Sequence, residues 1–206
     1  FFIWLGGLFL LGLTKRQVLI AATFLIIISL VLGTFVLEPY QKSRITSFLD
    51  SFGQGRESYN VLQANIAVGS GGLFGLGLGN GSQAKFGILP EATTDFALAA
   101  LAEQFGFFAL VIVLMLYFLI LSRLFYITAR ARDSFSKFFI FMFSVYFFSH
   151  VVINFVMNLG LVPVTGLPLP FISYGGSFLI SLMIGFSILG FSFIIISSPI
   201  LQKKMA

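Results

Sequence analysis

No residue between Lys137 and Lys203 carries a formal charge, and few folds accept a neutral stretch of that length. The whole chain has 206 residues, of which 58% are hydrophobic and 9% are charged. Ordinary soluble domains contain about 25% charged residues. One soluble core cannot bury so many apolar side chains, so the excess must face lipid. The sequence therefore predicts an all-α polytopic membrane protein.

Four apolar segments are long enough to cross a membrane. A spanning helix needs roughly 20 apolar residues, and such segments occupy residues 17–37, 98–122, 138–159 and 177–198. A fifth segment, residues 1–13, is shorter than a span. Because the chain begins there without Met, a charged n-region or a cleavage site, the segment does not read as a signal peptide. We expect about five transmembrane helices, the first of them truncated, and a preceding N-terminal part.

Basic residues concentrate in alternate loops. Residues 123–137 contain four basic residues and one acidic residue, net +3, whereas residues 38–103 contain four basic and six acidic residues, net −2. By the positive-inside rule, loop 123–137 and the basic C-terminus are cytoplasmic, and residues 38–97 and 160–176 lie outside. The positive charge thus indicates topology and contact with anionic membrane lipids, and we expect no nucleic acid partner. A single membrane domain, residues 1–206, accounts for the pattern.

The two outer segments are unusual as connections between helices. Residues 38–97 far exceed what neighbouring helices need, and such long loops are usually functional or disordered. The apolar, glycine-rich stretch 59–82 argues against disorder, and we expect it to lie along the bilayer interface or to re-enter the membrane. Residues 160–176 contain three prolines and no charge, so this loop is expected to be re-entrant and to lie at membrane depth.

Glycine occupies seven of the thirteen positions from Gly69 to Gly81. Such a backbone can approach a ligand closely or adopt positive φ, and it is able to cradle phosphate. The spacing Gly79-x-Gly81-x-x-Ala84 resembles a dinucleotide fingerprint, but neither a βαβ unit nor a P-loop lysine accompanies it. Tight packing and turns near the membrane interface are therefore the favoured interpretation.

Three acidic residues lie around the entrance to the segment 98–122. For Thr94 or Asp95, the simplest interpretation is a helix cap, because an acid there favours the positive end of the helix dipole. The functional alternative for Glu91 and Asp95 is a carboxylate that acts as a general base near the membrane surface. Glu103 lies deeper, where an acid is a functional candidate by default, unless it pairs with a basic residue of a neighbouring helix.

Three polar residues of segment 138–159 share one helical stripe. His150, Asn154 and Asn158 are spaced four residues apart, so their side chains project from the same face. That stripe is expected to face protein and to form hydrogen bonds between helices. A lone histidine is weak evidence for a metal site.

Several of these segments occur in an order that resembles the SEDS family, typified by RodA and FtsW. They are YQKSRITSFLD, QANIAVGSGGLFGLGLGNGSQ, LPEATTDF, a basic cytoplasmic loop and PVTGLPLPFISYGGS. SEDS proteins have ten transmembrane helices, and the chain resembles the last five, their C-terminal part. GLPLPF is more similar to the RodA branch, which the resemblance weakly favours, whereas GLGLGNGSQ is more similar to FtsW.

The resemblance implies a peptidoglycan glycosyltransferase. Such an enzyme polymerises glycan strands from lipid II during cell elongation or division and releases polyprenyl pyrophosphate. It works with a class B penicillin-binding protein, a transpeptidase, in the bacterial cytoplasmic (inner) membrane, with its active site on the extracytoplasmic side. On its own, without the earlier helices, this C-terminal part would be inactive.

The resemblance also implies site residues. The essential acid of the family falls on Asp95, with Glu91 in the same motif, and Asp95 is predicted to be the catalytic base. Ser173, Tyr174 and Ser177 match the SYGGS signature and are predicted to shape the substrate site. We expect Glu103 to contribute to substrate binding as well.

Cations are needed to stabilise a departing pyrophosphate. Arg44, Arg56 and Lys85 lie on the predicted outer side of the membrane and are candidates for this role. A divalent cation, Mg²⁺ or Mn²⁺, held by Asp95 or Glu91 is a further candidate. Each basic residue has an alternative role as a headgroup contact or a solvated loop charge.

Two other functions remain open at this point. A transporter that flips lipid II without bond chemistry also uses interrupted, Gly- and Pro-rich segments near the midplane. A non-catalytic scaffold that recruits a transpeptidase needs only exposed helix faces. Asp95 distinguishes them, because only the polymerase requires its carboxylate for chemistry.

Overall fold

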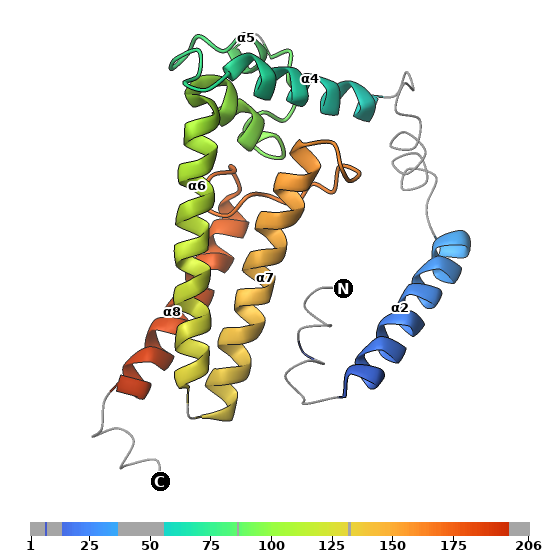
Figure 1. Ribbon diagram of the computed structural model, residues 1–206, viewed down its shortest axis with the longest axis vertical. Helices are drawn as coiled ribbons and strands as arrows, with labels where there is room; N and C mark the ends of the chain where they lie inside the picture. The colour runs from blue at the N-terminus through green and yellow to red at the C-terminus, as the bar shows by residue number, and fades with distance from the viewer. Residues whose placement is uncertain (1–6, 8–13, 37–55, 86, 132, 198–206) are drawn as a thin grey trace.

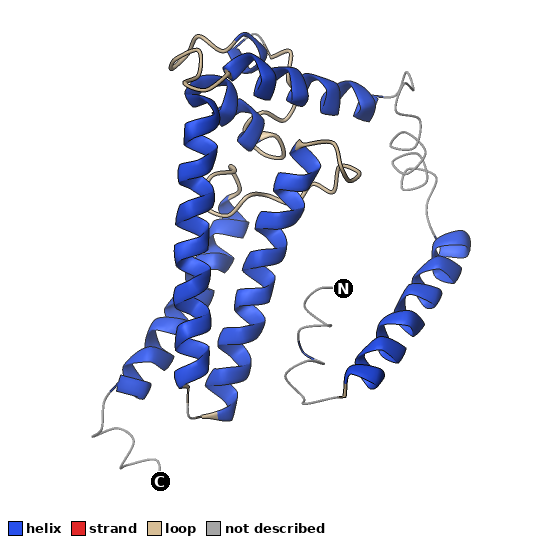
Figure 2. Cartoon of the chain, viewed as in Figure 1, coloured by secondary structure: helices blue, strands red, loops and turns tan. Residues whose placement is uncertain are grey.

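The computed structural model describes residue 7 and residues 14–36, 56–85, 87–131 and 133–197. This part of the chain is helical and contains no strand (Figure 2). The helices are α2 (Lys15–Val36), α4 (Arg56–Gly71), α5 (Ser82–Lys85), α6 (Ala97–Arg130), α7 (Ser134–Asn158) and α8 (Gly176–Ser197). The all-α prediction is confirmed, while most of segment 1–13 lies outside the described residues.

Helices α2, α7 and α8 match the predicted spans within a few residues at each end. Among the described residues, α6 and α7 are long and apolar enough to cross a membrane. In an apolar 18-residue stretch of α6, only 11% of the residues are buried. Bulky side chains such as Ile112 and Phe118 on α6 are 59% and 69% exposed. Lipid contact explains an exposed apolar surface of this size on α6.

Helices α6 and α7 lie side by side and are joined by a short turn (Figure 1). Asp133 begins α7, where its side chain accepts a hydrogen bond from the Ser136 amide at 2.9 Å. Buried residues of α6, α7, α8 and the segment before α8 form one apolar cluster; they include Leu98, Tyr117, Phe147, Leu169 and Leu182.

Helix α6 is interrupted at Gly106, where φ is 76° and ψ is −171°. The prediction of one continuous helix over 98–122 is therefore wrong at this point, and an unbroken helix begins only at Phe107. In a continuous helix, Phe107 and Phe108 would donate to the carbonyls of Glu103 and Gln104. Both bonds are replaced by bonds to the glycine-rich loop that follows α4.

Helix α6 and that loop exchange backbone hydrogen bonds in both directions. The amides of Phe107 and Phe108 donate to the carbonyls of Gly72 and Leu73 at 2.9 and 3.2 Å. In return, the carbonyls of Glu103 and Gln104 accept from the amides of Leu76 and Gly77 at 2.9 and 3.0 Å. These four backbone groups, which the break releases, thus all have partners.

The glycines allow this close approach. A Cβ added to Gly71 would overlap the carbonyl oxygen of Ala102, and one added to Gly75 would overlap that of Gln104. Gly106 itself faces the backbone of Leu73 and Gly75. Tight packing, the favoured interpretation of the glycine run, is confirmed.

Helix α4 lies across the ends of α6 and α7 (Figure 1). Its residues Ala64 and Ala67 are fully buried against Phe96 and Met157, whereas Leu62 on its other side is 56% exposed. Small residues on one face let α4 pack closely. A crosswise helix with one apolar exposed face is consistent with the expected position along the bilayer interface.

The segment between α7 and α8 descends between the helices, so that α8 begins below the upper ends of α6 and α7 (Figure 1). Its Pro170 carbonyl accepts a hydrogen bond from the Tyr117 hydroxyl at 2.6 Å, and its Pro168 carbonyl lies 3.3 Å from His150 Nδ1. Tyr117 is roughly 16 Å along α6 from Gly106. The segment thus packs between α6 and α7, while its expected re-entry to membrane depth stays a prediction.

Candidate functional site

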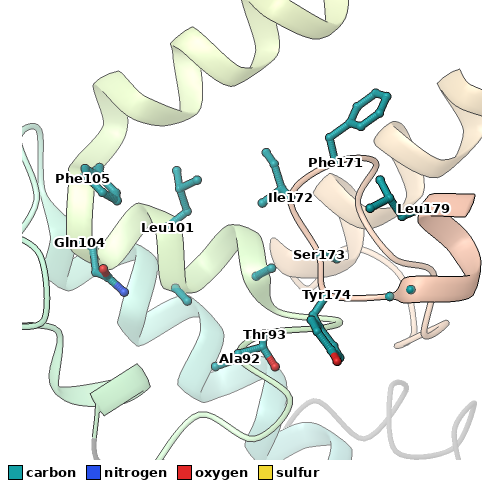
Figure 3. Close-up of a pocket in the computed structure, with 14 residues that line it drawn as sticks. Ala92, Thr93, Leu101, Gln104, Phe105, Phe171, Ile172, Ser173, Tyr174 and Leu179 are labelled. Atoms are coloured by element: carbon teal, nitrogen blue, oxygen red, sulfur yellow. The ribbon is translucent and has the colours of Figure 1, made fainter. Parts of the chain in front are cut away.

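A cleft of about 780 Å³ opens between the first part of α6 and the segment that leads into α8. Figure 3 shows Leu101, Gln104 and Phe105 on one side, with Phe171 and Tyr174 on the other. The lining is mainly apolar, with a few polar groups that include Thr93, Gln104 and Ser173. A large apolar cleft with few polar groups suits an amphiphilic ligand.

The PEATTDF motif forms a compact turn before α6. The Glu91 carbonyl accepts from the amides of Thr94 and Phe96, both at 3.1 Å, and its carboxylate accepts from the Thr94 hydroxyl at 2.8 Å. Glu91 itself has φ of 52°, a conformation that is uncommon for a residue other than glycine. The Glu91 side chain is exposed at this turn.

Helix α6 begins after Asp95. Phe96 occupies the N-cap position, and no side-chain hydrogen bond caps the helix there. The prediction that Thr94 or Asp95 is the N-cap residue is therefore wrong. The turn closed by Glu91 holds the Phe96 amide and keeps both residues ahead of the helix.

Three successive carbonyls of this motif are held by donors from the C-terminal third of the chain. The Thr93 carbonyl accepts from the Tyr174 amide at 2.8 Å, and the Thr94 carbonyl accepts from the Ser173 hydroxyl at 2.6 Å. The Asp95 carbonyl accepts from Asn154 and Asn158 of α7. Asn158 also accepts from the Ala99 amide of α6, which confirms the predicted bonding between helices through the polar stripe. The TTD and SY motifs therefore form one structural unit.

Asp95 is half-buried at the edge of this unit. It lies two residues from Thr93 and two from Ala97, both of which line the cleft, but it does not line the cleft itself. A Cβ built on Gly166 of the re-entrant loop would lie 3.7 Å from Asp95 Oδ2. The carboxylate is thus placed beside the re-entrant loop.

Glu103 is fully buried beneath the glycine-rich loop. Its Oε1 accepts from the Gln83 amide at 2.9 Å, and a Cβ added to Gly81 would lie only 2.6 Å from its Oε2. Its side chain does not line the cleft in this structure. Glu103 instead connects the break in α6 to the start of α5.

The other predicted site residues divide into three groups. Ser173 and Tyr174 line the cleft, whereas Ser177 is exposed on the first turn of α8 and does not line it. Arg44 and the side chains of Arg56 and Lys85 lie outside the described residues. Among the residues that the structure describes, no three His, Asp or Glu side chains gather as metal ligands, so a cation at Asp95 or Glu91 stays a prediction.

Sequence reasoning missed several cleft residues, including Thr93, Ala97, Leu101, Gln104 and Phe105. The signal that could have found them is the alanine pattern at 97, 99, 100 and 102, which is unlike the bulky sequence after Gly106. Small residues let a helix lie close to other backbone. Here they bring the start of α6 against α4 and the re-entrant loop.

Comparison with known proteins identifies the family. A family of cell cycle proteins, named for FtsW, RodA and SpoVE, matches residues 1–191. The chain belongs to the SEDS family. It is 40% identical to the peptidoglycan glycosyltransferase MrdB of Escherichia coli K12 over 191 residues, 89% of this chain and 51% of MrdB. As a SEDS member with exposed apolar helices, it is an integral membrane protein.

Other SEDS relatives agree with this assignment. The chain is 40% identical over 168 residues to a probable peptidoglycan glycosyltransferase FtsW of Coxiella burnetii, which covers 76% of this chain and 44% of the relative. A solved structure, described as structural coordination of polymerization and crosslinking by a peptidoglycan synthase complex, matches with a TM-score of 0.70. The match has 27% identity and covers 92% of this chain and 51% of that one. The chain spans about half the length of the curated relatives it matches.

Proposed function

We propose that the chain forms part of a peptidoglycan glycosyltransferase that polymerises glycan strands from lipid II in cell elongation or division. The names of its SEDS relatives support this activity. The observation that carries it here is the joining of the TTD and SY motifs beside one apolar cleft by the 2.6 Å bond from Ser173 to Thr94. A lipid-linked substrate needs such a site, with apolar walls for its tail and polar groups for its sugars.

Asp95 is the proposed general base. The 4-hydroxyl of the acceptor sugar attacks the anomeric carbon of the lipid-linked donor, and Asp95 takes the proton from that hydroxyl. The bond from the anomeric carbon to the phosphate oxygen breaks, and polyprenyl pyrophosphate leaves as a stable anion. Because this leaving group needs no proton, one carboxylate suffices, unlike the pair in an inverting glycosidase.

Other predicted residues have supporting roles in this proposal. Ser173 and Tyr174 line the cleft and are proposed to contact the substrate. Ser177 and Glu91 follow and precede the lining residues Gly176 and Ala92 in sequence and are proposed as further contacts. Glu103 supports the cleft wall from beneath, since its buried carboxylate holds the Gln83 amide.

Charge stabilisation completes the proposed site. Arg44, Arg56 and Lys85, or a Mg²⁺ or Mn²⁺ ion, would balance the charge of the pyrophosphate. This role is proposed for residues on the extracytoplasmic side, since the basic loops 15–16 and 123–137 favour the cytoplasm.

A class B penicillin-binding protein is the proposed partner, and the bacterial inner membrane is the proposed location. The solved structure that resembles this chain is described as a synthase complex that coordinates polymerization with crosslinking. A product strand that stays lipid-anchored would allow repeated addition before transfer to the transpeptidase.

The test is glycan formation from labelled lipid II by the protein supplied with the N-terminal half that its relatives carry, together with its penicillin-binding protein. Transpeptidation is blocked throughout. We expect polymer from the parent complex and none from Asp95→Asn, which should still fold and bind lipid II. Asp133→Asn is the matched control, because Asp133 caps α7 and asparagine also caps helices well.

A lipid II flippase is the second candidate. The break at Gly106 and the re-entrant loop favour it, because transporters place interrupted segments at their substrate sites. A parent complex that binds lipid II without polymerising it would contradict the glycosyltransferase and favour flipping, to be measured in vesicles. Polymer from both the parent and Asp95→Asn would keep the enzyme and remove Asp95 from its chemistry; a scaffold would make no polymer and move no lipid.

A further inference from the structure

Asn158, fully buried at the end of α7, bridges two backbone groups at the start of α6. Its Nδ2 donates to the Asp95 carbonyl at 3.1 Å, and its Oδ1 accepts from the Ala99 amide at 3.2 Å. If α6 extended back by one residue, those two backbone groups would bond each other. The side-chain amide takes the place of that bond and keeps Asp95 outside the helix.

Asn154, also fully buried, lies one turn earlier on α7 and holds the same carbonyl. Its Nδ2 donates to Asp95 at 3.2 Å and to the Leu167 carbonyl of the re-entrant loop at 2.8 Å. The two asparagines also contact each other, with Asn158 Nδ2 donating to Asn154 Oδ1 at 3.1 Å. They form a connected buried network in which each member fixes the other.

We propose that Asn154 and Asn158 are positioning residues for the Asp95 carboxylate. The inference rests on the proposed function, in which Asp95 is the general base. Two donors fix the carbonyl of Asp95, and its neighbours Thr93 and Thr94 are held at their own carbonyls. With the peptide planes fixed, the direction of the Asp95 Cα–Cβ bond is fixed as well, and the carboxylate it carries lies close to Gly166 of the re-entrant loop.

A general base must be held close to its productive geometry. Misplacement of a catalytic group by about 1 Å costs about 100-fold in rate, and supporting hydrogen bonds hold such a group in place. Without Asn158, the Ala99 amide is free to bond the Asp95 carbonyl and to draw Asp95 into the first turn of α6. The carboxylate would then turn toward a capping position.

A purely structural role for the asparagines makes a different prediction. In that case their loss lowers the amount of folded protein and leaves the turnover of each folded molecule unchanged. A positioning role lowers kcat and leaves the affinity for lipid II unchanged, because neither asparagine lines the cleft. The split between kcat and substrate affinity therefore separates the two roles.

The experiment compares Asn158→Leu with the parent, in the same complex and with labelled lipid II as substrate. We expect kcat per folded molecule to fall about 10-fold to 100-fold, with lipid II affinity unchanged. Ser144→Ala is the matched control: Ser144 is equally buried on α7, but its hydroxyl donates to the Ile140 carbonyl of its own helix. This control should keep the parent kcat.

The outcomes separate the inference from the proposed function. An unchanged kcat in Asn158→Leu beside an active parent overturns the inference alone, as does a loss of lipid II affinity at constant kcat. An inactive but folded parent complex overturns the proposed function and the inference with it. If Asn158→Leu does not fold, Asn158→Ser, which leaves room for water at the two released groups, is measured in its place with the same expected loss of kcat.

Discussion

The two parts of α6 on either side of Gly106 have opposite surroundings, although both are apolar in sequence. Before Gly106, six of the nine α6 residues are buried, among them the alanines at 97, 99, 100 and 102 and Glu103. After it, only Tyr117, Leu124 and Thr128 are buried, and bulky side chains face outward. Hydropathy does not distinguish these parts, but side-chain size does: small residues mark the part that meets other backbone, and large ones mark the part that faces lipid.

Gly106→Ala should have the largest effect on stability, because it changes the residue at the boundary between the two parts of α6. The added Cβ would overlap the backbone of Leu73 and Gly75 at a residue with φ of 76°. Positive φ costs about 1–2 kcal/mol for alanine, and overpacking adds about 1–3 kcal/mol. We expect loss of about 3 kcal/mol of stability, measured by thermal unfolding in detergent.

Gly190→Ala is the control for that change. Gly190 lies in α8, where an added Cβ meets nothing within 4 Å, so stability should be unchanged or slightly higher. Equal effects of the two substitutions would contradict the special role of the break at Gly106.

Glu103→Leu should have an intermediate effect within the buried part of α6. The change removes the acceptor for the Gln83 amide, and an unsatisfied buried donor costs about 1–3 kcal/mol. Glu103→Gln keeps an oxygen for that amide and should be milder. Thermal unfolding of the two variants separates the hydrogen bond from the charge, since equal losses would mean that the charge is what matters.

Phe118→Leu should have the smallest effect, because Phe118 lies in the exposed part of α6 and is 69% exposed. Substitutions away from a packed site usually change stability by no more than about 0.5 kcal/mol. A loss as large as that of Glu103→Leu, in the same unfolding measurement, would mean that this face of α6 is packed against protein.

Helices α2, α7 and α8 and most of α6 could be predicted from the sequence, because length and hydropathy alone determine a span, whereas α4 and α5 were not predicted as helices. That residues 160–176 pack against the helices was also predictable, since three prolines and no charge argue against an exposed loop. The break at Gly106 was not, because an isolated glycine is common in apolar helices and its meaning depends on Leu76 and Gly77, far away in the sequence.

The candidate site was only partly predictable. Ser173 and Tyr174 were predicted from their motif to shape the site, and they line the cleft. The prediction that Asp95 caps α6 was wrong, because the Asp95 carbonyl is held by the side chain of Asn158, 63 residues later in the sequence. Local rules consider only the capping residues nearby in sequence. Contacts between residues far apart in the sequence depend on tertiary packing, and no short segment of the sequence reveals them.

The exchange of bonds at Gly106 also imposes an order on the biogenesis of the protein. When α6 leaves the translocon, the carbonyls of Glu103 and Gln104 and the amides of Phe107 and Phe108 need partners, and lipid offers none. Those partners come from the glycine-rich loop, which is synthesised about 30 residues earlier. The loop must therefore pack against α6 before those four backbone groups are satisfied, which couples the folding of the two segments.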